Sequence, residues 1–115
     1  MKKKSTIVVK TQFEGVHQYL DAPQQVDFLR SVHRHMFYVN IEIEVDHYER
    51  ELEFIIVKGA IDRFIRCASA FSVLDSCETM ASKICDYVTR IYGQRNMKCC
   101  VYEDNENGGC VYYEY

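Results

Sequence analysis

The amino-acid sequence predicts an α+β domain in which an antiparallel sheet carries two helices on one face. Three observations lead to this expectation: alternating apolar and polar residues in the first half of the chain, helical spacing of apolar residues in the middle, and two short strand-like segments at the end. Strands on both sides of a helical pair are typical of this class. The length of 115 residues fits one domain, which we place at residues 1–115.

The first half of the chain is expected to form three strands. Residues 5–13 place alternate apolar side chains on one face. Residues 37–45 show the clearest alternation, because every odd position is apolar and most even positions are polar. The segment 18–32 connects these two strands. After a turn at 46–50, residues 51–57 are expected to return as the second arm of a hairpin.

Two helices are expected to follow. In residues 57–68 apolar side chains recur every three or four positions, which is helical spacing. The second helix carries a similar apolar stripe over residues 80–91. Asp75 and Glu78 have capping-box spacing at its start, and Gly93 is a suitable C-terminal stop.

Two short strands complete the predicted fold. They span residues 97–102 and 110–115, and the turn between them is rich in asparagine and glycine. The expected order of elements is therefore β-β-β-α-α-β-β.

Charge and composition argue against several partners. The net charge is -3 and the one dense basic run is Lys2-Lys3-Lys4, so we expect no nucleic-acid partner. No apolar stretch has the length of a transmembrane helix, and no signal peptide is recognisable, so we expect no membrane partner and a cytoplasmic location. In that compartment the six cysteines are expected to be reduced thiols.

Three histidines are the residues best suited to chemistry. If the clearest strand begins at His33, then His33 and His35 point to one face, about 6–7 Å apart. His17 follows the first strand and could supply a third nitrogen. Three histidines with an open fourth position are typical of a catalytic zinc site. An H-x-H pair alone is a weak signal, and ordinary polar residues at a strand end are the alternative.

Several short motifs, in order along the chain, resemble those of the 6-pyruvoyltetrahydropterin synthase family, which includes the 6-carboxytetrahydropterin synthases. The family's F-x-x-x-H is similar to FEGVH at 13–17, and its H-G-H-N-Y is similar to HRHMF at 33–37. Its V-D-F resembles LEF at 52–54. Its P-T-A-E-N-L-A resembles SCETMA at 76–81, and its closing V-x-V-x-E-T resembles VYED at 101–104.

The resemblance implies a T-fold, in which a four-stranded antiparallel sheet carries two helices on one face. It also implies a trimer or hexamer whose sheets join into a barrel, with sites between subunits. By the same resemblance His17, His33 and His35 match the zinc ligands, and Glu103 matches the glutamate that anchors a pterin- or purine-like ligand. Glu78 could assist in ligand binding, although a capping role is the alternative.

The sequence departs from the family where protons are moved. Residues 26–32 contain no cysteine before the H-x-H pair, and residues 66–75 contain no histidine between the two helices. The family's acid–base groups are therefore missing from their usual places. Asp27, Cys67 and Cys77 are the remaining candidates for a catalytic role, with packing as the alternative for the cysteines.

Three hypotheses follow for function. The first is a zinc-containing protein that binds a pterin- or purine-like molecule without the family's usual reaction, for example to sequester a nucleotide signal. The second is a zinc-dependent carbon–oxygen lyase that acts on dihydroneopterin triphosphate. The third is an oligomeric scaffold in which the histidines are structural.

Overall fold

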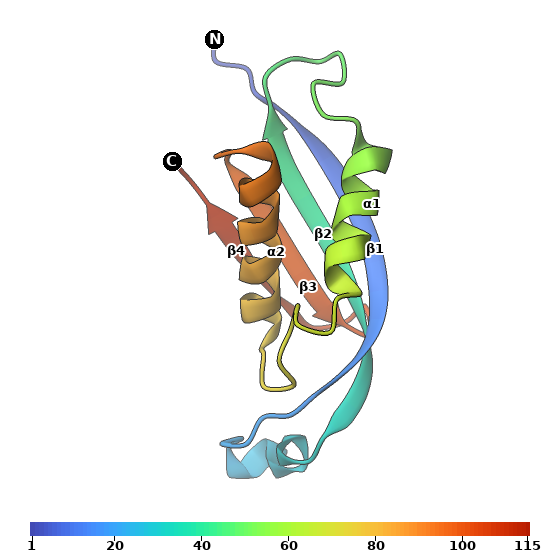
Figure 1. Cartoon of the computed structure of the whole chain (residues 1–115). Helices are drawn as coiled ribbons and strands as arrows, with labels where there is room; N and C mark the ends of the chain where they lie inside the picture. Colours follow the sequence, from blue (N-terminus) through green and yellow to red (C-terminus); the bar gives the residue numbers. More distant parts are fainter.

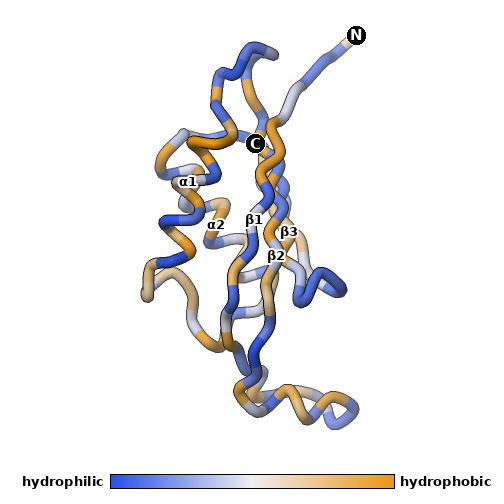
Figure 2. The backbone as a smooth tube through the Cα atoms, turned by 90° about the vertical axis from the view of Figure 1, so that its right-hand side faces the viewer, coloured by the Kyte–Doolittle hydropathy of each residue, from blue (hydrophilic) through white to orange (hydrophobic).

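The structure, a computed structural model, describes all residues 1–115 and consists of one antiparallel sheet with two helices on one face (Figure 1). Its elements are β1 (Ser5–His17), the 3-10 helix η1 (Gln24–Arg30), β2 (His33–Val45), α1 (Phe54–Ile65), α2 (Cys77–Tyr92), β3 (Met97–Glu103) and β4 (Gly108–Tyr113). The strands lie in the order β1-β2-β3-β4, and both helices lie to one side of the sheet in Figure 2. The predicted α+β class is confirmed. Neither helix is long and apolar enough to cross a membrane.

The two longest strands of the sheet, β1 and β2, pair with each other as an antiparallel hairpin. The two strands are paired over thirteen residues each, from Ser5 opposite Val45 to His17 opposite His33. Because side chains alternate between the two faces of a strand, all odd-numbered residues of this pair share one face. That face carries the apolar residues, and the alternation of hydropathy along the strands is visible in Figure 2.

The core lies between the sheet and the helices. Phe37, Ile41 and Ile43, three odd-numbered residues of β2, are completely buried there. Val57 and Ile61 of α1 and the apolar stripe of α2 pack against them. The core is apolar throughout, because no polar or charged residue is buried. The members from α2 are Cys77, Met80, Ala81, Ile84, Cys85 and Val88.

The prediction of a third strand at 51–57 was wrong. Helix α1 begins at Phe54, and the Glu53 side chain accepts a hydrogen bond from the backbone N–H of Ile55 at its N-terminus. The order of the sheet strands and helices is therefore β-β-α-α-β-β. A short apolar run such as residues 54–57 is compatible with either a strand or a helix, and here the packing of Val57 against the sheet decides for the helix.

The start of α2 also differs from the prediction. Ser76, and neither Asp75 nor Glu78, caps the helix, and its hydroxyl accepts a hydrogen bond from Thr79 N at 3.1 Å. Asp75 instead pairs with Lys83 at 2.6 Å. The predicted stop is confirmed, since Gly93 ends the helix with φ 87°, a conformation that a residue with a side chain rarely adopts.

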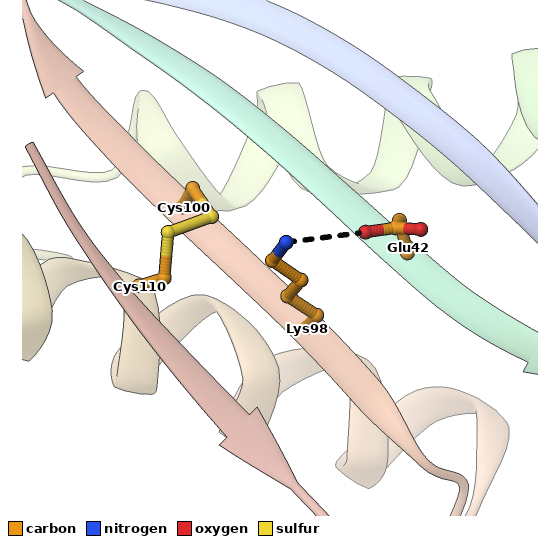
Figure 3. Close-up of a disulfide and its surroundings, with 4 residues drawn as sticks. All are labelled: Glu42, Lys98, Cys100 and Cys110. Carbon is orange, nitrogen blue, oxygen red and sulfur yellow. Dashed lines mark ion pairs between the residues drawn. A yellow bond between two sulfur atoms is a disulfide. The ribbon is translucent and has the colours of Figure 1, made fainter.

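Two cysteines form a disulfide, which corrects the expectation of six reduced thiols. Cys100 of β3 lies directly opposite Cys110 of β4, and the bond joins them on the sheet face away from the helices (Figure 3). Cys99 points the other way and is buried in the core. The register of the last hairpin brings the two cysteines together, and that register depends on the turn between the strands.

A half-buried ion pair joins the loop after β2 to the loop after α2. The guanidinium group of Arg95 donates hydrogen bonds to both carboxylate oxygens of Glu51, at 2.6 Å and 2.8 Å. Arg95 also donates to the carbonyl oxygen of Glu44 at 3.2 Å. The bonds from Arg95 lower the pKa of Glu51 to about 2.

This shift predicts a pH dependence of stability. The pKa of Glu51 is lower in the folded chain than its ordinary value of 4.5, so the ionised carboxylate stabilises the fold above that pH. The contribution is lost as the pH falls from 4.5 towards about 2. Glu51→Gln should therefore lower the free energy of unfolding at neutral pH and flatten its decline in that acid range, as measured by urea unfolding at several pH values. Glu49→Gln, an exposed neighbour, is the control. Identical pH profiles for wild type and Glu51→Gln would contradict this role.

Candidate metal centre

The three histidines predicted as a site meet at one end of the β1–β2 hairpin. His17 is the last residue of β1 and lies opposite His33, the first residue of β2. His35 lies opposite Gly15, two residues further along the same pair. All of these positions are odd-numbered, so the imidazoles share the face that carries the core. The sheet register thus brings the rings together, with centroids 4.4 Å, 4.9 Å and 5.0 Å apart.

The orientation of two rings is set by hydrogen bonds at Nδ1. His33 Nδ1 donates to the carbonyl oxygen of Ser31 at 2.8 Å, and His35 Nδ1 contacts a carboxylate oxygen of Asp104 at 2.7 Å. Both partners are acceptors, so the proton of a neutral ring is on Nδ1 and the lone pair is on Nε2. This arrangement, an imidazole held from behind by an oxygen, is typical of metal-binding histidines.

The Nε2 atoms of His17, His33 and His35 are all buried and lack a hydrogen-bond partner. A buried polar atom without a partner costs free energy, so a group of three requires an explanation. The pKa of His17 lies below its usual value, mainly because of burial and despite the opposing effect of Glu103. A neutral imidazole is the form that binds a metal ion.

Four potential ligand atoms gather at this point. They come from His17, His33, His35 and Glu103, and all lie within 4.8 Å of one another. Bonds of about 2.0–2.1 Å in a tetrahedral zinc site place the ligand atoms about 3.3 Å apart. The donor set of imidazoles and a carboxylate is one that zinc accepts, so these residues could hold such an ion.

The floor of the cluster is aromatic and closely packed. The Phe37 ring lies 5.4 Å from the ring of His17 and 5.8 Å from that of His35, and it stacks on Phe13 at 5.2 Å. Gly15 makes this possible, because a Cβ at that position would lie 3.1 Å from the Phe37 ring. An apolar floor excludes water from the inner side of the cluster.

Asp104 is a contributor that the sequence did not reveal. One carboxylate oxygen accepts from His35, the other accepts from Met36 N at 3.0 Å, and Asp104 N donates to the carbonyl oxygen of Met36 at 2.7 Å. The hydrogen bond with His35 is the main reason that the pKa of Asp104 lies below its usual range. Asp104 and Asn105 both have positive φ, 52° and 57°, in the tight turn that leads from β3 into β4. The only hint in the sequence was the turn-forming composition of this segment.

A cavity of about 380 Å³ adjoins the histidines. This volume lies in the range of sites that bind small molecules. The wall combines His17 and His33 with acidic groups and with apolar side chains from the segment around η1 and from the start of α2. The acidic residues on the wall are Asp75, Glu78 and Glu103, and the apolar ones include Leu29 and Leu74.

Two further predicted residues line this cavity. The Glu78 side chain lies over the backbone of Gly109, where any Cβ would collide with it. Cys77 precedes it, but burial raises the pKa of its thiol to about 12. A protonated thiol is a poor nucleophile.

The other two candidates for a catalytic role lie elsewhere. Asp27 is exposed on η1, and Cys67 is exposed just after α1, where its thiol donates to the carbonyl oxygen of Arg63. Neither lines the cavity beside the histidines. The structure thus brings together the three histidines, both glutamates and Cys77, and leaves Asp27 and Cys67 apart from them.

No known protein-family description matches this chain, and no curated protein is significantly similar to it. Fold and side-chain geometry therefore define the class of protein: a small α+β domain with a four-stranded antiparallel sheet and a cluster of histidine and glutamate that could hold a metal ion.

The substitution Asp104→Asn tests whether the hydrogen bond from His35 Nδ1 to Asp104 orients His35 for metal binding. The amide retains the size of the side chain but weakens acceptance from the His35 N–H, so we expect the affinity for zinc to fall about 10–100-fold. Competition with a chromophoric chelator measures it. His33→Ala should abolish tight binding, and Glu106→Gln, an exposed change in the same turn, should leave it unaltered. An Asp104→Asn variant with wild-type affinity would show that the contact does not orient a ligand.

Proposed function

We propose that this chain is a divergent pterin-synthase-like protein with a T-fold that holds zinc on His17, His33 and His35 and binds a pterin- or purine-like molecule in the adjoining cavity. The observation that carries the proposal is the group of three buried Nε2 atoms without partners, directly beside a cavity of about 380 Å³. The order of the motifs along the chain adds to it.

The acidic wall of the cavity supports a planar ligand that donates hydrogen bonds. A carboxylate can accept two parallel hydrogen bonds, and the edge of a pterin or guanine offers an amino group beside a ring N–H. Three carboxylates lie on this wall, those of Asp75, Glu78 and Glu103, and that of Asp75 is already paired with Lys83. Zinc held by the histidines would supply Lewis acidity to an oxygen of the ligand.

The cavity wall lacks groups suited to the proton transfers of the family's reaction, which favours binding without turnover. Cys77, the one cysteine there, has a pKa of about 12 and is a neutral thiol at physiological pH. No base with the position of the family's histidine lies between the helices. Retention of a ligand, for example a nucleotide signal that is sequestered, is therefore the function that we favour over turnover.

Self-association is part of the proposal. β1 and β4 are the edge strands of the sheet, and β1 is thirteen residues long with one side unpaired within the chain. Long exposed edges favour association with further strands. We propose a trimer or hexamer in which the sheets join edge to edge into a barrel, as the T-fold resemblance implies.

Calorimetric titration of the zinc-loaded protein with pterins and guanine nucleotides tests ligand binding. Wild type should bind a member of this set, and Glu78→Gln should weaken the affinity about tenfold or more, because a charge-assisted hydrogen bond contributes roughly 1.5–3 kcal/mol. Glu106→Gln is the matched control.

Two outcomes would contradict the proposal. Absence of binding by wild type, with Glu78→Gln behaving identically, would leave an oligomeric scaffold as the better interpretation. Turnover of dihydroneopterin triphosphate by wild type would establish the lyase instead.

A further inference from the structure

Glu103 occupies an unusual position among the acidic residues of the cavity wall. It is the last residue of β3 and lies opposite Phe37 of β2, so its side chain emerges on the same face as the histidines. Its Oε2 atom is 2.8 Å from His17 Nε2 and 3.0 Å from His35 Nε2. One oxygen atom thus contacts two imidazole nitrogens at once.

These contacts do not have the geometry of hydrogen bonds. The Nε2 atoms of both rings have no hydrogen-bond partner, although the Glu103 oxygen is close enough in distance. A ring N–H that donated to the carboxylate would point at the oxygen. Atoms that surround a common centre instead point at that centre and pass one another at about 3 Å, as the ligands of a tetrahedral ion do.

The position of the proton on His35 also indicates that Nε2 faces a cation. His35 Nδ1 faces a carboxylate of Asp104, which accepts its proton, so a neutral His35 has a lone pair at Nε2. A lone pair at 3.0 Å from the Glu103 carboxylate is repulsive unless a cation lies between the two. A neutral His35 and the Glu103 carboxylate are therefore complementary to a cation bound between them.

We infer that Glu103 is the fourth ligand of the metal ion, which makes the centre a closed set of three imidazoles and one carboxylate. The inference rests on the metal centre of the proposed function and deepens it. Sites with four protein ligands are closed, whereas catalytic zinc sites keep one position for water or substrate. A ligand that needs the metal must then displace Glu103, and Glu78 is the carboxylate left free to recognise a heterocycle in the cavity.

The turn after β3 holds Glu103 in this position. Glu103 N donates to the carbonyl oxygen of Asn107 at 2.8 Å, and the next residue, Asp104, is bonded to both backbone groups of Met36. Glu103 and the group that orients His35 are thus adjacent in the chain. One short turn supplies a ligand and the support for another, which rigidifies both.

Cobalt substitution distinguishes a closed centre from an open one. The visible absorption of Co²⁺ bound to the wild-type protein should change little on addition of millimolar azide, because four protein ligands leave no position free. Glu103→Ala should bind Co²⁺ about tenfold or more weakly and should gain an azide-dependent spectral change. Glu103→Gln preserves the size of the side chain and should show the same loss of affinity if the alanine variant does not fold. Glu106→Gln, an exposed change in the same turn, should match wild type in both measurements.

The possible outcomes distinguish a failure of the Glu103 inference from a failure of the proposed metal centre. Equal azide responses in wild type and Glu103→Ala, or equal Co²⁺ affinities, would overturn the role of Glu103 and leave the three-histidine site intact. Failure of folded wild type to bind Co²⁺ or Zn²⁺ would overturn both.

Discussion

The antiparallel register of β1 with β2 is the constraint on which both the core and the candidate metal centre depend. Because His17 pairs with His33 and the period of a strand is two, the odd-numbered side chains of both strands lie on one face. The same parity that buries Phe37 and Ile41 under the helices brings the three imidazoles together beyond them. A shift of one residue would move the apolar set to the open face and separate the histidines at the same time.

Where the helices end, the face of the hairpin changes from apolar to polar. Phe37 forms the boundary, with the core on one side of it and the rings of His17 and His35 on the other. The three Nε2 atoms are buried there, and a buried polar atom without a partner is costly, so these imidazoles favour a bound partner. The fold thus builds a rigid, partly dry site at the end of a strand pair, with its support in the turn between β3 and β4.

That turn joins several features that are far apart in sequence. At its start, Asp104 contacts Met36 and His35, and Glu103 contacts two of the histidines. A few residues further, Cys110 meets Cys100 on the opposite face of the sheet (Figure 3). The conformation of this hairpin therefore fixes a candidate ligand, the orientation of a histidine and a covalent link between the last two strands.

The sequence by itself determined the periodic parts of this protein. Alternation in residues 37–45 predicted a half-buried strand, helical spacing predicted α2, Gly93 marked its end, and the H-x-H pair at a strand start predicted two imidazoles on one face. The tertiary structure decided what local patterns leave open. Residues 54–57 fit a strand or a helix equally well, and packing on the sheet made them helical. Asp104 and the Cys100–Cys110 pair depend on which residues the turn places opposite one another, a long-range property that no local spacing records.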